Sequence, residues 1–69
     1  MITIKVFKSG GGPQANVEVR VSGPNGISKG RTDSMGVVNF NLKRGKYEVF
    51  VGGKSLYNDL IADVQIVYV

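Results

Sequence analysis

The 69-residue sequence contains no cysteine, no histidine and no tryptophan, and only two prolines. Without cysteine the chain has no disulfide, no iron–sulfur cluster and no thiolate zinc site. Without histidine it has no imidazole ligand for a metal and no imidazole group for acid–base catalysis. A chain of this length buries only about 60% of the surface that its unfolded form exposes. We therefore expect one domain over residues 1–69, held together by side-chain packing alone.

The chain also lacks a long hydrophobic run and any strong clustering of charge. Nine Lys and Arg residues against five Asp and Glu residues give a net charge of +4. The basic residues are dispersed, and their only cluster, Lys43-Arg44-Gly45-Lys46, is typical of a solvated turn. Residues 60–69 are too few to span a bilayer, and Met1 leads into an alternating pattern rather than a signal peptide. We expect a soluble chain with no membrane contact, whose compartment these residues leave undetermined.

What the sequence does contain is apolar residues that alternate with polar ones. Val17, Val19 and Val21 each stand between polar residues, as in a half-buried strand. No window shows the apolar spacing of three and four that predicts a helix. Alternation predicts strands at residues 2–7, 15–22, 27–32, 37–42, 46–51 and 60–69, with a further short strand at 54–57. In the last long strand it predicts these residues on the core face: Leu60, Ala62, Val64, Ile66 and Tyr68.

Glycines mark the connections between these strands. All of them except Gly30 fall in predicted turns, and Asp33-Ser34-Met35-Gly36 has the residues of a type I turn. Strands spaced by roughly 8–12 residues with such turns are typical of a sandwich or barrel. The expected fold is therefore all-β, a small antiparallel β-sandwich of six or seven strands.

Three segments resemble the carboxypeptidase regulatory-like domains. The segment Gly30–Phe40 is similar to their Gly-x-Thr-Asp-x-x-Gly-x-x-x-Phe pattern. Residues 12–21 and 43–49 resemble their opening strand and their Pro-x-Gly-x-Tyr-x-Val segment, with a basic residue in place of the proline. Transthyretin-like (prealbumin-like) sandwiches and collagen-adhesin B-type repeats share these segments. The resemblance implies a transthyretin-like Greek key of Ig-like architecture and an extracellular or cell-surface location.

The residues that carry the resemblance also have a folding role by their own chemistry. Thr32 and Asp33 begin a turn in which the Asp side chain can accept hydrogen bonds from backbone amides, and Gly36 supplies a permissive backbone at its close. Gly45 allows the tight connection that brings Tyr47 inward, where its ring fills core. We interpret Thr32, Asp33, Gly36 and Gly45 as structural turn residues.

No catalytic constellation can be recognised. Hydroxyisourate hydrolases, the enzymatic branch of the resembling fold, rely on histidines and a Tyr-Arg-Gly-Ser-type tail, whereas this chain ends Ile66-Val67-Tyr68-Val69. The five carboxylates fall in different predicted segments, and no EF-hand spacing is present. Alternation turns Lys5 and Asp63 away from the core, against the Lys–Asn or Lys–Asp isopeptide bond of collagen-adhesin repeats. We expect no enzyme activity, no catalytic residue, no cofactor and no metal.

The apolar residues that alternation leaves off the core faces predict an interface. They are Phe7, Val37, Phe50, Ile61, Val67 and Val69. Residues 64–69 are uncharged, mostly β-branched and free of proline and glycine, which is the composition of a strand-pairing segment. We expect a protein partner or a second copy, with a dimer favoured. The expected function is that of a non-enzymatic binding, spacer or assembly module that acts through strand edges and sheet faces.

The alternative is a small β domain that binds carbohydrate or single-stranded nucleic acid. Such domains use a basic groove and exposed aromatic rings on which bases stack. Phe7, Phe50 and Tyr57 are the aromatics not assigned to the core, and Phe50 with Tyr57 would form a platform if they were neighbours. The turn pattern fits a sandwich better than a nucleic-acid-binding barrel, so protein contact is the leading interpretation.

Overall fold

The computed structural model describes all 69 residues and contains seven β-strands and no helix. The strands are β1 (Ile2–Phe7), β2 (Glu18–Gly23), β3 (Gly26–Arg31), β4 (Val37–Phe40), β5 (Gly45–Val51), β6 (Lys54–Ile61) and β7 (Val64–Tyr68). The predicted all-β class is confirmed, and the strand count agrees with the larger of the two expected numbers.

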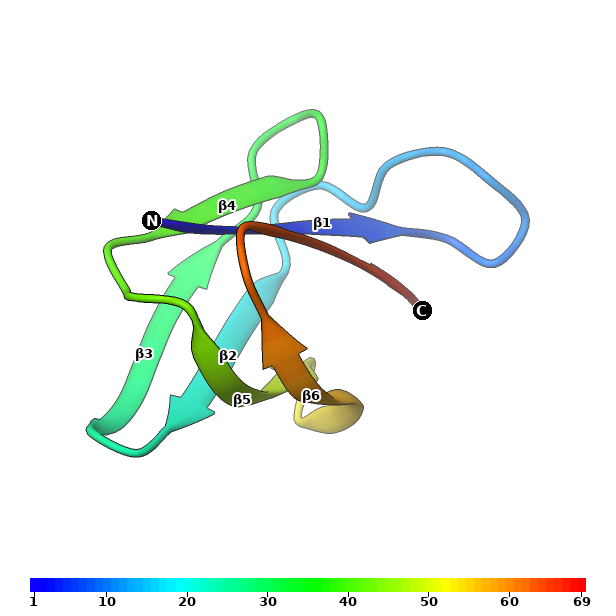
Figure 1. The fold of residues 1–69 in the computed structure, drawn as a ribbon. Helices are drawn as coiled ribbons and strands as arrows, with labels where there is room; N and C mark the ends of the chain where they lie inside the picture. The colour runs from blue at the N-terminus through cyan, green and yellow to red at the C-terminus, as the bar shows by residue number, and fades with distance from the viewer.

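The strands form two sheets that pack face to face (Figure 1). One sheet has three strands in the order β4-β1-β7, and the other has four in the order β3-β2-β5-β6. Every pairing is antiparallel except that of β1 with β7, which is parallel. The fold is therefore a small β-sandwich in which the first and last strands of the chain lie side by side.

The core lies between the sheets and takes alternate residues from β1, β2, β4 and β5, one residue each from β6 and β7, and none from β3. In β1, Ile2, Ile4 and Val6 are fully buried, while the residues between them are half-buried. The buried hydrophobic cluster consists of Ile2, Ile4, Val6, Val19, Val21, Val38, Phe40, Tyr47, Val49, Val51, Ile61 and Val67. Only 14 of 69 residues are buried, so each core side chain carries a large share of the stability.

The C-terminal stretch differs from the single strand expected over residues 60–69. A bend at Ala62 and Asp63 divides it, because β6 ends in the four-stranded sheet and β7 begins in the three-stranded sheet. The predicted core face is wrong here. Ile61 and Val67 are buried, whereas the five residues expected inside are exposed: Leu60, Ala62, Val64, Ile66 and Tyr68.

Alternation gave the wrong face because apolar residues occupy both faces of this stretch. Leu60 is followed by Ile61, and Ile66 is followed by Val67, so either phase of the pattern offers a hydrophobic row. Moving the phase by one residue transfers every side chain to the opposite face. The change of sheet at the bend sets the phase, and that is a tertiary feature outside the local pattern.

The turn from Asp33 to Gly36 joins β3 to β4 and is fixed to β1. Oδ1 of Asp33 accepts hydrogen bonds from the backbone N–H groups of Met35 (2.8 Å) and Val37 (3.0 Å). The Gly36 N–H donates to the Asp33 carbonyl (3.0 Å), and Gly36 has a φ of +77°. The Gly36 carbonyl accepts from the N–H of Val6 (2.8 Å), which connects the turn to the central strand of its sheet.

Thr32 is a buried polar side chain beside this turn. Its hydroxyl donates to the Gln14 carbonyl (2.8 Å) and accepts from the N–H of Val17 (3.0 Å). Both contacts cross between segments far apart in the sequence, so Thr32 attaches the connection before β2 to the end of β3.

Replacing Thr32 with Val is expected to lower the free energy of unfolding by about 1–3 kcal/mol, because the partly buried Gln14 carbonyl and Val17 N–H both lose their partner. Thr3→Val is the matched control, since the Thr3 hydroxyl donates to the Asn39 side chain at an exposed position (2.6 Å). Urea unfolding followed by far-UV circular dichroism measures both. Equal losses in the two variants would show that the Thr32 hydrogen bonds stabilise the protein no more than the exposed Thr3 hydrogen bond does.

Tyr47 fixes the connection between β4 and β5. Its ring is buried, and its hydroxyl donates to the Lys43 carbonyl (2.5 Å). A tyrosine near the start of a strand that bonds the backbone a few residues upstream is the tyrosine corner found in β-sandwiches. Gly23 leaves room for this ring, because a Cβ there would overlap it.

Candidate interaction surface

The outer face of the three-stranded sheet carries apolar side chains from all three of its strands. Phe7 lies opposite Tyr68, and Lys5 lies between Val37 and Ile66. Because successive side chains point to opposite faces of a sheet, these residues share the face turned away from the core. The apolar face is defined as Phe7, Val37, Val64, Ile66 and Tyr68.

Strand β7 supplies the most exposed part of the apolar face. Val64, Ile66 and Tyr68 expose 49%, 43% and 61% of their surface. Single exposed apolar residues are ordinary, but three at alternate positions of one strand form a contiguous patch. The Tyr68 ring lies against Phe7, with centroids 6.2 Å apart and planes tilted by 35°. Lys5 is the one charged side chain among them.

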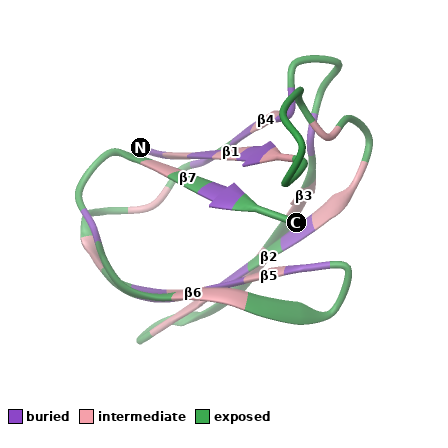
Figure 2. Cartoon of the chain, turned by 90° about the vertical axis from the view of Figure 1, so that its right-hand side faces the viewer, coloured by how far each residue is buried: buried purple, intermediate pink, exposed green.

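Strand β7 is also an edge of its sheet (Figure 2), since it pairs only with β1. Alternate residues of a strand in a parallel ladder turn their backbone groups to the same neighbour. Residues 63, 65, 67 and 69 turn theirs to β1; for example, the Val69 N–H donates to the Phe7 carbonyl (2.9 Å). The N–H and C=O groups of Val64, Ile66 and Tyr68 therefore point to the open edge.

The six residues predicted as an interface do not form one surface. Phe7 and Val37 lie on the apolar face, and the exposed Val69 follows β7 directly. Phe50 is half-buried on the outer face of the other sheet, beside Arg20. The predicted set is thus divided between the two sheets.

For the other two residues the prediction is wrong. Ile61 and Val67 expose only 1% and 3% of their surface and belong to the core. The exposed row of Val64, Ile66 and Tyr68, which alternation placed inside, takes their place. The signal for this row in the sequence is the uncharged composition of residues 64–69, which predicted strand pairing whatever the phase.

The aromatic platform of the alternative function is not formed. Phe50 pairs with Ser55 and Tyr57 pairs with Val49 across β5 and β6, which places the two rings on opposite faces of the sheet. Tyr57 packs against the core, and its hydroxyl donates to the Leu60 carbonyl (2.7 Å). The observation that would favour binding of carbohydrate or single strands is therefore absent.

Acidic side chains lie among the basic residues on the outer face of the four-stranded sheet. Arg20 forms an ion pair with Glu18, with 3.4 Å between Nε and Oε1. Glu48 lies on the same face and accepts a hydrogen bond from the Ser55 hydroxyl (2.6 Å). The face therefore lacks the uninterrupted positive groove that follows a nucleic-acid backbone.

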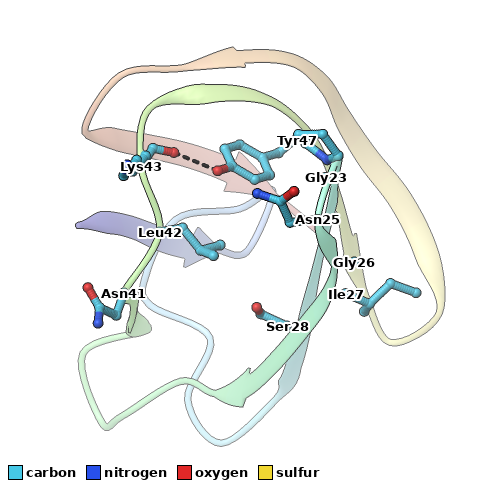
Figure 3. Close-up of a pocket in the computed structure, with 10 residues that line it drawn as sticks. Gly23, Asn25, Gly26, Ile27, Ser28, Asn41, Leu42, Lys43 and Tyr47 are labelled. Atoms are coloured by element: carbon cyan, nitrogen blue, oxygen red, sulfur yellow. Dashed lines mark hydrogen bonds between the residues drawn. The ribbon is translucent and has the colours of Figure 1, made fainter.

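A hollow of about 270 Å³ opens at one end of the sandwich, between the β2–β3 turn and the β4–β5 connection (Figure 3). Tyr47 and Leu42 border it, and the side chains of Asn25 and Ser28 are turned toward it. The Lys43 carbonyl at its rim already accepts the Tyr47 hydroxyl. No carboxylate lines the hollow, so it offers hydrogen-bonding groups but no acid–base pair.

Two of the carboxylates are engaged separately in local structure. Asp33 holds its turn, and Asp59 accepts a hydrogen bond from the N–H of Leu60 (2.7 Å). No group of three or more acidic side chains lies close enough together to hold a metal ion. The contacts of Asp33 and Asp59 stabilise the turn and the strand in which these residues lie.

No family model, curated protein or solved structure matches this chain. The structure contains no helix that is long and apolar enough to cross a membrane. The apolar face and its open edge are the features from which a function can be argued.

Proposed function

We propose that this protein is a non-enzymatic binding and assembly module that contacts protein, and above all a second copy of itself, through the apolar face. The observation that carries the proposal is the exposed row of Val64, Ile66 and Tyr68 on an edge strand. Covering apolar surface stabilises a contact by ~25 cal/mol per Å². A protein with so small a core gains stability when a partner binds only its folded form.

The composition of the surface supports a protein partner. The centre of a protein–protein interface is rich in aromatic and aliphatic side chains and poor in charge, and its rim is polar. The apolar face contains the Phe7–Tyr68 aromatic pair. A polar margin lies beside it, where the Thr3 hydroxyl donates to the Asn39 side chain.

The proposal extends to the kind of sandwich. The Thr32–Gly36 turn pattern and the Gly45–Tyr47 segment support a carboxypeptidase regulatory-like or transthyretin-like domain, since these are positions at which the sequence resembles that family. The structure has Gly45 as the first residue of β5 rather than in the turn that the sequence predicts for it. An extracellular or cell-surface location follows from the same resemblance. In such a setting a domain held by packing alone serves as a binding unit or spacer within an assembly.

Replacing Ile66 with Lys is expected to convert a self-associating protein into a monomer, because the charge falls in the middle of the apolar face. Sedimentation velocity over a concentration series that reaches the high micromolar range measures this. Ile27→Lys is the matched control, since Ile27 is also exposed but lies on the other sheet. A wild-type protein that stays monomeric across the series would disprove self-association, and equal sensitivity to both substitutions would disprove the assigned face.

A further inference from the structure

We propose that two copies join edge to edge, with β7 pairing antiparallel to β7 of the second copy about a twofold axis at Ile66. This inference rests on the proposed function and specifies its partner and geometry. The two three-stranded sheets then form one continuous sheet across the dimer.

The unpaired backbone groups of β7 fit this register. A twofold axis at Ile66 places Ile66 opposite itself and Val64 opposite Tyr68 of the second copy. In an antiparallel ladder, alternate opposing residues exchange both of their backbone hydrogen bonds. The hydrogen-bonded positions are those of Val64, Ile66 and Tyr68, whose N–H and C=O groups point to the open edge. The pairing therefore forms ~6 hydrogen bonds.

One of these edge groups already has a contact. Nε2 of Gln65 donates to the Ile66 carbonyl (3.1 Å). A carbonyl oxygen has two lone pairs and can accept a second hydrogen bond. The Ile66 carbonyl can therefore accept from the N–H of Ile66 in the second copy while the Gln65 contact remains.

The side chains of the outer face fit the same register. Ile66 meets Ile66, and Val64 of each copy meets Tyr68 of the other. Aromatic residues beside β-branched ones are favourable cross-strand pairs. No charged residue lies within Val64–Tyr68, so no like charges meet at the twofold axis.

Opposite charges lie at the two ends of the paired strands. The observed phase of β7, in which Val67 is buried, places Asp63 on the inner side of the sheet, opposite to the outward side that the sequence pattern predicts. Lys8 follows β1 on the same side, and both charged residues are exposed. The one ion pair of the chain joins other residues, Arg20 and Glu18. In the proposed register Asp63 lies opposite Val69 of the second copy. Lys8 of that copy follows β1 beside this Val69, so the Asp63 carboxylate attracts the Lys8 ammonium group. The twofold axis produces this pair of opposite charges twice.

The other sheet edges carry features that discourage pairing between molecules. Short strands, charged side chains and bulges protect edges. Strand β4 has only four residues, β3 carries Lys29 and Arg31, and β6 begins with Lys54 and pairs with β5 through an irregular register. Strand β7 has none of these features, which makes it the edge where a second copy binds.

Amide hydrogen exchange followed residue by residue tests the geometry in the unmodified protein. The amides of Val64, Ile66 and Tyr68 are expected to exchange quickly when the protein is dilute and at least tenfold more slowly once dimers form. The amides of Gln65 and Val67, which point to β1, serve as internal controls that are protected in both states. Packing through the sheet faces alone would leave the three edge amides unprotected at every concentration.

Ile66→Pro separates the edge from the face. Proline lacks an N–H, and this N–H points away from β1, so the β1–β7 ladder is preserved. Sedimentation is expected to show a monomer, whereas Ile66→Ala, which retains the N–H, still forms dimers at higher concentration. Should the proline variant fail to fold, the exchange experiment on the wild-type protein decides the question.

A disulfide test fixes the register. Because the chain has no cysteine, Ile66→Cys introduces one thiol per copy, and opposing Cα atoms ~5.5 Å apart lie within disulfide range. Val64→Cys is the control, since its two copies stand about 14 Å apart in this register. Mild oxidation is expected to cross-link the first variant and leave the second as monomers on a non-reducing gel.

The outcomes distinguish the two proposals. Dimers that are lost in Ile66→Lys but kept in Ile66→Pro, with unprotected edge amides, would support association through the face and overturn the edge pairing. A monomeric wild-type protein would overturn both.

Discussion

Ile4→Ala is expected to lower the free energy of unfolding by about 2–5 kcal/mol, the loss typical of truncating a buried aliphatic side chain to Ala. Ile4 is fully buried in the middle of β1, the central strand of its sheet, and lies opposite Val38 of β4. Domains have about 0.05–0.15 kcal/mol of stability per residue, which for this chain is roughly 3–10 kcal/mol. The truncation therefore removes much of the total.

Urea unfolding measures this loss, followed by far-UV circular dichroism or tyrosine fluorescence because the chain has no tryptophan. Ile27→Ala is the control, since it deletes the same atoms from a side chain that is 65% exposed. We expect a change within about 0.5 kcal/mol for Ile27, as for other surface substitutions. Similar losses at both positions would contradict the assigned core.

Gly36→Ala is expected to lower the free energy of unfolding by about 2–5 kcal/mol, for two separate reasons. A side chain at a φ of +77° costs about 1–2 kcal/mol. A Cβ at this position would also lie 2.5 Å from the Val6 carbonyl oxygen and 3.1 Å from the Gln14 nitrogen, and overpacking adds about 1–3 kcal/mol. Backbone must move in β1 or in the segment before β2 to accept the substitution.

Gly12→Ala separates the two reasons. Gly12 has a φ of +82° but nothing within 4 Å of its Cβ position, so only the conformational cost of about 1–2 kcal/mol applies. The difference between the variants in urea unfolding reports the crowding at Gly36. If both variants lost the same stability, the close approach of the turn to β1 would have no energetic weight.

The sequence predicts those strands whose two faces differ in polarity. Val19 and Val21 alternate with Glu18 and Arg20, and the structure buries the two valines as expected. The glycine-marked turns likewise separate most strands at the expected places. Where one face is polar, only one phase of alternation buries the hydrophobic set, so local pattern and tertiary structure agree.

The candidate surface could be predicted only in part, for the opposite reason. An interface made of a sheet face requires apolar residues on the outer face as well as on the inner one. Alternation of apolar and polar residues then no longer indicates which side chains face the core. Phe7 and Val37 were assigned outward correctly because their neighbours Val6 and Val38 belong to clear core rows. Residues 64–69 have no neighbouring core row of this kind. Which of their side chains face the core depends on the bend at Ala62 and Asp63.

The parallel pairing of β1 with β7 has a mechanical consequence. Because these strands run in the same direction, Met1 and Val69 lie at opposite ends of their ladder (Figure 1). Tension applied to these two residues would load all the hydrogen bonds between β1 and β7 together, in shear, instead of opening them one after another from an end. The load would thus fall on β7, the strand whose other edge is unpaired.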